Sequence, residues 1–246
     1  MIRTGVVLPT FRDKPGEAFA AADEAVAAGV DGVFCYDHIW PMGQPERPAL
    51  APFPVLGALA TRLAPNDDRR GGPFLGTLVA RISLVSNDVL AAQFAALEAL
   101  APGRVIAGLG TGDRLSEEEN RAYGLPFPPA AERRAELVAL GRELKRAGTA
   151  VWVAGGPAYR IEEARAAGAA LNVWDADPAA VAARARGPEA IEVTWAGPPP
   201  PVGPPLAALL HALHEAGATW AVFGWPVDVG ALVTAARSVA EADRRR

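Results

Sequence analysis

The chain contains few of the residues from which common scaffolds and reactive sites are built. Among its 246 residues there are one cysteine, Cys35, and three histidines. One cysteine excludes an internal disulfide framework, and a chain without disulfides is typical of a reducing compartment, so we expect a cytoplasmic protein. Cys35 lies inside an apolar run, and we therefore expect a small buried residue there.

Long apolar stretches and clusters of positive charge are also scarce. No segment approaches the roughly 18 consecutive apolar residues of a transmembrane helix, and the apolar run before Pro9 is too short for a signal peptide. The net charge is -4, and cations gather only at the last three residues, 244–246. Because nucleic-acid phosphates are bound by clustered cations, we expect neither a nucleic-acid nor a membrane partner. We interpret residues 241–246 as a flexible basic tail.

Several common catalytic motifs are absent as well. There is no Walker A lysine pattern and no G-x-S-x-G nucleophile elbow. The segment GLGTG at 108–112 is close to a dinucleotide-binding loop, but Asp113 occupies the place of the third glycine. His211 and His214 have a spacing that could hold a metal, yet they flank the leucine stripe of a predicted outer helix. We expect them to face solvent or a subunit partner, and we predict no metal site.

What the chain does contain is a regular alternation of apolar strands and amphipathic helices. Half of its residues (50%) are apolar, which is enough for one large core. A helix that ends on glycine and leads into an apolar strand recurs at 27–34, 166–173 and 215–222. The pattern predicts strands at 4–8, 32–36, 74–80, 105–109, 151–154, 170–174, 191–195 and 220–223. It predicts helices at 17–28, 55–64, 87–101, 132–147, 159–167, 178–186, 206–216 and 228–240, and a further one near 116.

Two local signals mark helix starts in this scheme. We interpret Asn87 as the N-cap of one helix, and Ser116 with Glu119 as the capping box of the next. Eight strands that alternate with helices are the number of a closed barrel. We therefore predict an α/β fold, a single (β/α)8 TIM barrel over residues 1–246, with an open doubly wound sheet as the alternative.

In either fold, ligands bind beyond the carboxyl ends of the strands, where two pairs of residues carry candidate chemistry. Asp37 and His38 follow the strand 32–36; an imidazole there can exchange a proton near neutral pH, and the carboxylate can orient it or raise its pKa. Gly155 and Gly156 open a turn into a helix, which can hold an anion. The alternatives are an ordinary loop closure and a plain turn.

Short motifs throughout the chain belong together. They are YDHI at 36–39, GTLV at 76–79, AAQFAAL at 91–97, PGRV at 102–105, GLGTGDRL at 108–115, YGLPF at 123–127, the glycine pair at 155–156 and NVW at 172–174. With these motifs the chain resembles the luciferase-like flavin monooxygenase and deazaflavin oxidoreductase superfamily, and more closely its coenzyme F420-dependent branch. The resemblance covers almost the whole chain.

The resemblance implies a luciferase-like TIM barrel, often a homodimer, that binds a flat flavin or deazaflavin in its mouth. It implies that His38 is an acid/base beside the reactive ring atom and that Asp37 lies next to it. It also implies a non-proline cis peptide between Leu78 and Val79, as a bulge behind the ring. The implied cofactor-binding residues, of which the glycine pair receives the cofactor phosphate, are Gly76, Thr77, Leu78, Val79, Arg81, Gly110, Thr111, Gly112, Asp113, Gly155, Gly156 and Trp174.

Some positions depart from the family pattern. Arg81 replaces a smaller residue and could contact or crowd the cofactor, and Asp88 stands where many relatives have proline. The segment 197–205 is short where relatives carry an insertion, so the barrel has shortened loops and the substrate pocket is either shallow or completed by a partner. Substrate contacts are expected from the loops 9–14, 40–52 and 197–205.

We predict from these residues an F420-dependent oxidoreductase that transfers hydride between the deazaflavin and a small organic substrate. Two alternatives stay open. One is an FMN-dependent luciferase-like monooxygenase, which needs a flavin reductase as partner. The other is a non-catalytic flavin-binding barrel, which Arg81 and the short segment 197–205 favour.

Overall fold

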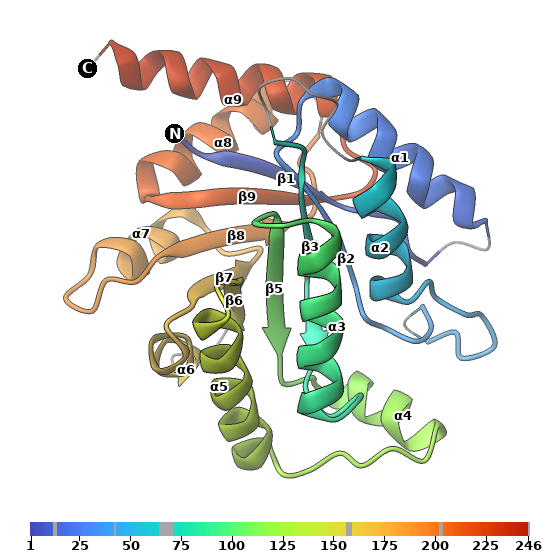
Figure 1. Ribbon diagram of the computed structural model, residues 1–246. Coiled ribbons are helices and arrows are strands. Elements are labelled where there is room, and N and C mark those ends of the chain that lie inside the picture. Colours follow the sequence, from blue (N-terminus) through green and yellow to red (C-terminus); the bar gives the residue numbers. More distant parts are fainter. Residues whose placement is uncertain (12–13, 42, 64–70, 156–158, 202–203, 246) are drawn as a thin grey trace.

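A computed structural model of the protein describes residues 1–11, 14–41, 43–63, 71–155, 159–201 and 204–245, and shows strands at the centre with helices around them (Figure 1). The strands are β1 (Arg3–Val7), β2 (Gly32–Cys35), β3 (Phe74–Thr77), β4 (Ala80–Arg81), β5 (Val105–Gly110), β6 (Ala150–Gly155), β7 (Ala170–Trp174), β8 (Val193–Gly197) and β9 (Ala218–Gly224). The helices are α1 (Pro15–Ala28), α2 (Pro52–Arg62), α3 (Asn87–Leu100), α4 (Arg114–Ala122), α5 (Ala130–Arg146), α6 (Tyr159–Ala167), α7 (Pro178–Arg186), α8 (Pro204–Ala216) and α9 (Val229–Arg244).

The strands form one parallel sheet that closes on itself. Their order is β3-β2-β1-β9-β8-β7-β6-β5-β4, and a further pairing joins β3 to β5. Both β3 and the two-residue β4 pair with β5, so they share one position of the barrel. The eight predicted strands are therefore present and the predicted (β/α)8 barrel is confirmed, whereas an open doubly wound sheet would leave its edge strands unpaired.

The third predicted strand, 74–80, is interrupted. The peptide bond between Leu78 and Val79 is cis, and β4 resumes pairing only at Ala80. Periodicity indicated one uninterrupted strand here because all its residues are apolar or small. The Leu78 amide still donates to the Cys35 carbonyl at 2.8 Å, and both Leu78 and Val79 line the cavity described below.

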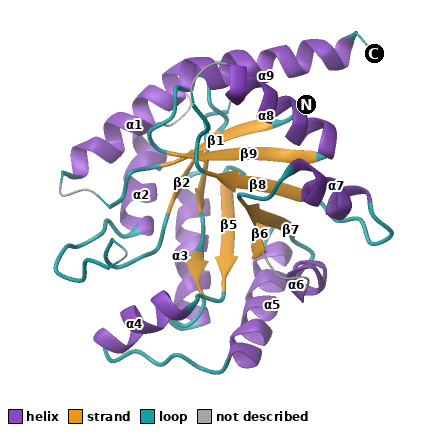
Figure 2. Cartoon of the chain, turned by 180° about the vertical axis from the view of Figure 1, so that it is seen from behind, coloured by secondary structure: helices purple, strands orange, loops and turns teal. Residues whose placement is uncertain are grey.

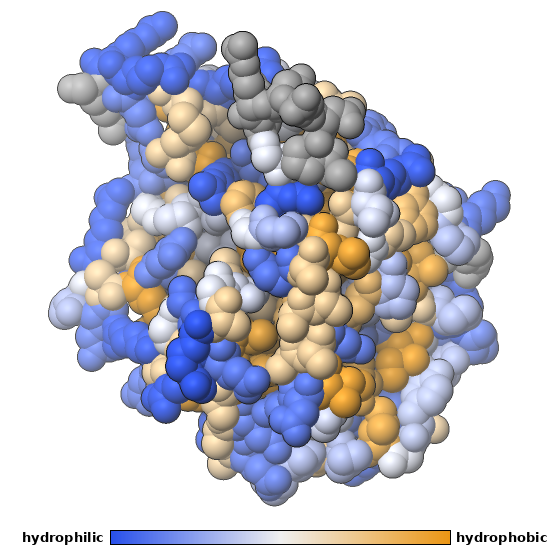
Figure 3. Space-filling model, in the orientation of Figure 1, coloured by the Kyte–Doolittle hydropathy of each residue, from blue (hydrophilic) through white to orange (hydrophobic). Residues whose placement is uncertain are grey.

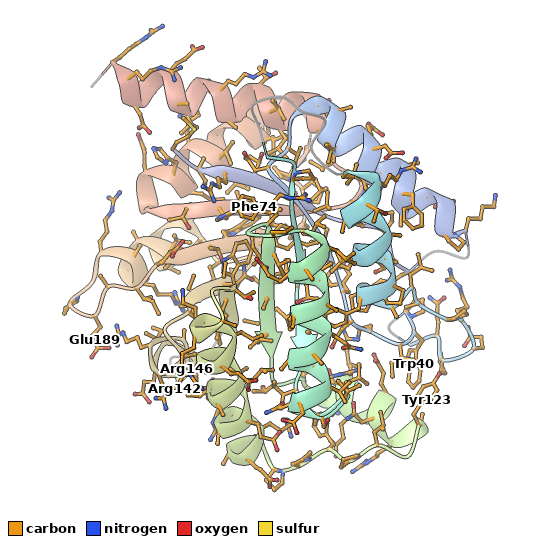
Figure 4. All side chains as sticks on the ribbon, in the orientation of Figure 1. Trp40, Phe74, Tyr123, Arg142, Arg146 and Glu189 are labelled. Carbon is orange, nitrogen blue, oxygen red and sulfur yellow. The ribbon has the colours of Figure 1, made fainter. Side chains whose placement is uncertain are left out.

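Apolar side chains fill two regions, one between sheet and helices and one inside the barrel. Phe94 of α3 is fully buried in the first region. Inside the barrel, the ring centroids of Phe34 and Trp152 are 5.2 Å apart and those of Trp152 and Trp220 are 5.4 Å apart. Phe74, labelled in Figure 4 at the amino end of β3, meets Trp220 edge to face. The interior is thus packed with side chains, as barrels of this size require.

Two predicted helix starts are wrong, although the helices exist. Ser86, one residue before the expected Asn87, caps α3, because its side chain accepts a hydrogen bond from the Val89 amide. Asp113 caps α4, because its carboxylate accepts from the Ser116 amide at 3.0 Å. Ser116 and Glu119 therefore lie inside α4 and form no capping box, which releases the Glu119 carboxylate for other partners.

The carboxyl-terminal helix is longer than the sequence pattern predicted. α9 continues to Arg244, so residues 241–244 are helical and do not belong to a separate tail. The amino group of Met1 lies 3.5 Å from the Asp243 carboxylate, which brings the two ends of the chain to the same side of the barrel (Figure 2).

The two histidines of α8 have partners within the chain. His211 Nε2 lies 2.8 Å from the Ser238 hydroxyl, and His214 Nε2 lies 2.9 Å from an Asp243 carboxylate oxygen. Both partners belong to α9, which packs against α8 (Figure 1). Both hydrogen bonds lie at the surface, so these histidines do face solvent in part, but the sequence pattern did not predict that α9 supplies a partner for each of them.

The outer surface carries mixed side chains. On the face shown in Figure 3, hydrophobic residues lie in small groups among hydrophilic ones. None of the helices in the described part of the chain combines the length and the apolar composition needed to cross a membrane.

Candidate active site

A cavity of about 680 Å³ lies where the carboxyl ends of the strands meet. This volume is in the range of about 300–1,000 Å³ that is usual for small-molecule sites. Its walls are apolar and aromatic, with a few polar groups at one side. The lining residues are Phe11, Tyr36, Asp37, His38, Leu78, Val79, Arg81, Gly110, Thr111, Gly112, Asp113, Ser116, Ala154, Asn172, Trp174 and Trp225.

His38 is held at the mouth by a carboxylate from α4. The side chain of His38 is 23% exposed, and its Nδ1 lies 2.6 Å from Glu119 Oε1. The second oxygen of Glu119 accepts a hydrogen bond from the Ile39 amide at 2.9 Å. With Nδ1 engaged, Nε2 is the ring nitrogen left to face the cavity, so one edge of the imidazole is fixed and the other is available for proton exchange.

Arg81 ties the two carboxylates of this cluster together. Its Nη2 donates to Glu119 Oε2 at 2.9 Å, and its backbone amide donates to Asp37 Oδ2 at 2.5 Å. A third bond of 3.3 Å runs from Nη1 to the backbone carbonyl of Ser116. The side chain is only 2% exposed, so Arg81 forms part of the wall and does not fill the cavity.

These contacts set the charge of the cluster. Burial opposes the protonated form of His38, but the hydrogen bond and charge of Glu119 outweigh it and raise the His38 pKa. Burial likewise opposes the Glu119 carboxylate, but hydrogen bonds from His38 and the Ile39 amide hold its pKa below the ordinary value. Burial raises the pKa of Asp37 despite the nearby Arg81. An imidazolium paired with a carboxylate is therefore favoured at the cavity edge.

The other parts of the chain fix α4 in place. Asn120 donates from its amide nitrogen to the carbonyls of Ser83 and Pro126, both at 2.8 Å. The rings of Trp40 and Tyr123 stack with centroids 5.9 Å apart and lie side by side in Figure 4, which joins the loop after β2 to the end of α4. The position of Glu119 beside His38 is thus set by contacts at the carboxyl end of the helix.

Glycines on β5 allow the interrupted strand to approach closely. A Cβ on Gly108 would lie 2.1 Å from the Thr77 carbonyl oxygen, and one on Gly110 would lie 2.5 Å from a Val79 methyl. Larger residues at these positions would push the Leu78 and Val79 bulge into the cavity.

The loop after β5 completes that side of the site. Gly112 has φ +71°, a conformation that favours glycine, and it leads directly into the Asp113 cap of α4. The carbonyl of Thr111 accepts a 2.7 Å hydrogen bond from Arg133 Nε of α5. Hydrogen bonds from Ser116 hold the Asp113 pKa below its usual value against the effect of burial.

A row of aromatic rings forms another part of the wall. Phe11 and Tyr36 stack with centroids 5.3 Å apart, and Tyr36 lies 6.4 Å from Trp174. Trp174 follows as the exposed end of β7, and Trp225 lies beyond β9. The cavity thus has a polar side around His38 and an apolar, flat-sided one.

The predicted site residues fall into three groups. Ten line the cavity: Asp37, His38, Leu78, Val79, Arg81, Gly110, Thr111, Gly112, Asp113 and Trp174. Two lie outside its lining: Thr77 is fully buried and bonds the Gly108 carbonyl at 2.8 Å, and a Cβ on Gly76 would meet the Phe34 ring at 2.7 Å. Gly155 ends β6 directly after the lining residue Ala154, while Gly156 lies outside the described residues.

Sequence reasoning missed several residues that the fold brings here. Glu119 was read as a helix cap, and only the packing of α4 shows its contact with His38. Of the expected substrate loops, 9–14 contributes Phe11, whereas no lining residue comes from the described parts of 40–52 and 197–205. Trp225 could have been predicted as a lining residue, because it is an aromatic residue directly after the last strand.

The sequence of the chain is similar to that of known proteins over part of its length. No protein-family model matches the chain. Over 138 residues the chain is 36% identical to the F420-dependent glucose-6-phosphate dehydrogenase of Beutenbergia cavernae, a match that covers 56% of this chain and 38% of that relative. The chain thus matches well under half of the length of such curated relatives, and its activity as a whole is a matter for proposal.

Solved structures match over nearly the whole chain. One is an F420-dependent secondary alcohol dehydrogenase in complex with an F420-acetone adduct, with TM-score 0.68, 16% identity and coverage of 96% of this chain and 97% of that one. Another is the F420-dependent tetrahydromethanopterin reductase from Methanopyrus kandleri, with TM-score 0.68, 14% identity and coverage of 98% and 99%. The chain therefore has the fold of these barrels, and in sequence it is similar to F420-dependent dehydrogenases over about half of its residues.

Proposed function

We propose that the chain is an F420-dependent oxidoreductase that acts on a small organic substrate at the cavity of the barrel. The observation that carries this proposal is the His38–Glu119 contact at the edge of a cavity that Leu78 and a row of aromatic rings also line. The sequence similarity to F420-dependent dehydrogenases supports the choice of cofactor.

The residues present fit a flat deazaflavin. Gly108 and Gly110 leave the bulge clear of the cavity, and Arg81 is drawn into the wall by its carboxylate partners. Leu78 and Val79 would lie behind the ring system, and Thr111 with its neighbouring glycines would line its side. The turn at 155–156 would receive the phosphate. When bound, the deazaflavin supplies the hydride acceptor or donor.

His38 provides the proton chemistry. With Nδ1 bonded to Glu119, Nε2 is the ring nitrogen left for the substrate. The imidazolium that Glu119 favours would donate a proton to the oxygen of a carbonyl substrate as it is reduced, and in the reverse direction the neutral ring would take the proton of the alcohol. Asp37, held by the Arg81 amide, lies near enough to His38 for its charge to favour the imidazolium as well. The apolar walls exclude water from the reacting atoms, which favours hydride transfer over side reactions.

The test compares His38→Ala with His211→Ala, a histidine on the outer helix α8. Binding of F420 is followed by its fluorescence, and turnover by reduction of F420 with a panel of alcohols. We expect His38→Ala to lose about a hundred- to ten-thousandfold in turnover with F420 affinity retained within a few fold, and His211→Ala to behave as wild type. Unchanged turnover in His38→Ala would remove this residue from the mechanism.

The same titration separates the alternatives. Binding of FMN but not F420 would favour a luciferase-like monooxygenase with a flavin reductase as partner. Binding of either cofactor with no substrate turned over would favour a non-catalytic flavin-binding barrel. We also propose that the protein is a cytoplasmic homodimer, as the family resemblance implies, and light scattering during size-exclusion chromatography tests its mass.

A further inference from the structure

The aromatic wall indicates the shape of the substrate. Phe11, Tyr36 and Trp174 form a continuous row, with neighbouring centroids 5.3 and 6.4 Å apart. Phe11 also meets the His38 ring edge-on at 5.9 Å, so the row reaches the proposed acid/base. Trp174 is 50% exposed, unusual for so large an apolar side chain at the end of a buried strand. A flat apolar ligand group would cover these rings.

The cationic side chains among the described lining residues are already bonded to a carboxylate of the protein. Of the described lining residues, only Arg81 and His38 can be cationic, and both are bonded to the Glu119 carboxylate. Asp37 and Asp113 add two further acids to the same lining. An anionic substrate would therefore meet carboxylates without a surplus cation to bind it.

Three helix starts at this rim are occupied by carboxylates of the protein. A helix amino terminus can bind a phosphate, but α4, α7 and α9 each begin with an aspartate cap. Asp113, Asp177 and Asp228 accept hydrogen bonds of 3.0, 2.7 and 2.8 Å from backbone amides of their helices. At these three helices a protein carboxylate therefore holds the place that a substrate phosphate would need.

We propose, on the basis of the function proposed above, that the substrate is an uncharged alcohol with an aromatic group, or the matching carbonyl compound. Its ring stacks on the row of Phe11, Tyr36 and Trp174, and its oxygen faces His38. The acidic lining disfavours sugar phosphates, for which the similar dehydrogenase from Beutenbergia cavernae is named.

The test uses substrates matched in shape. Reduction of F420 is measured with benzyl alcohol, with 4-(hydroxymethyl)benzoate, which adds one negative charge to the same ring, and with glucose 6-phosphate. We expect kcat/KM for benzyl alcohol to exceed that for either anion by at least about tenfold, the effect of roughly 1.4 kcal/mol. The reverse reaction is measured with benzaldehyde and reduced F420.

A substitution in the aromatic row tests whether the substrate ring stacks there. Phe11→Leu keeps an apolar side chain but removes the flat ring, and we expect it to lower kcat/KM for benzyl alcohol about three- to tenfold. Phe53→Leu, the same change in α2 outside the cavity lining, should leave it unchanged.

The outcomes separate the two proposals. If F420 binds and an anionic substrate is used as well as benzyl alcohol, the substrate class is wrong while the oxidoreductase proposal stands. If F420 binds but neither benzyl alcohol nor benzaldehyde reacts, the substrate class is again wrong. If F420 does not bind at all, the proposed function itself fails.

Discussion

Glu119 offers the sharpest test of the polar cluster, through the isosteric change Glu119→Gln. The carboxylate has three partners, His38 Nδ1 at 2.6 Å and the Ile39 amide and Arg81 Nη2 at 2.9 Å each, and it is 2% exposed. Removing one charge from a buried, hydrogen-bonded ion pair costs about 3–5 kcal/mol, because the remaining charges are left without compensation. We expect a loss of that size in the free energy of unfolding, measured by urea denaturation.

The pH dependence of that loss follows from the two pKa shifts. The folded pKa of His38 lies above 6.5, so its contribution to stability is complete below pH 6.5 and disappears as the pH rises through the folded value. The folded pKa of Glu119 lies below 4.5, so its contribution is present above pH 4.5 and is lost as the pH falls through the folded value. The difference between wild type and Glu119→Gln should therefore be largest between pH 4.5 and 6.5. The difference should be smaller at higher pH, where the His38 contribution is lost. Part of it should remain, because Glu119 is still bonded to Arg81.

A neighbouring residue provides the control. Glu118→Gln removes the same charge from an exposed position of the same helix and should change stability by less than about 0.5 kcal/mol. Nuclear magnetic resonance titration of His38 should show a lower pKa in Glu119→Gln and an unchanged one in Glu118→Gln. If the two variants are equally stable, or if the His38 pKa does not fall, the assigned role of Glu119 is wrong.

Two further perturbations test the barrel wall. Gly108→Ala would place a Cβ 2.1 Å from the Thr77 carbonyl oxygen, so we expect it to destabilise the protein by about 1–3 kcal/mol and to weaken F420 binding. Gly57→Ala in α2, where the nearest atom is 3.9 Å away, should instead stabilise by up to about 1 kcal/mol, and denaturation curves that rank the two equally would contradict the proposed contact. Burial raises the pKa of the Cys35 thiol to about 12, so at pH 8 Ellman's reagent should modify Cys35 only after unfolding, and fast modification of the folded protein would contradict this.

Local patterns in the sequence determined the elements and their order. Glycine after an alanine-rich helix predicted the left-handed C-cap at Gly29, which has φ +101°. An apolar run predicted β7, and the alternation of helices with strands predicted α6 and α7, all three with their observed bounds. These features depend on residues a few positions apart, so they can be read along the chain.

The position of His38 at the mouth followed from the same reasoning, because it directly follows a buried strand and parallel strands of a barrel end on one face. The family motifs then named most of the residues that line the cavity. The motifs did not indicate which residue each side chain contacts. Arg81 was expected to contact or crowd the cofactor, yet it lies in the wall because Asp37 and Glu119 bind it from two sides.

Only the tertiary structure decided which distant residues meet. Glu119 is 81 residues from His38, and no periodicity or cap signal relates the two. The helix that carries Glu119 is positioned by packing against the loop after β2, which places a carboxylate against the imidazole. The sequence by itself therefore set the barrel and the place of the acid/base, since these depend on local spacing. The packing of α4 set the charge around that histidine, since electrostatic interaction depends on distance in space.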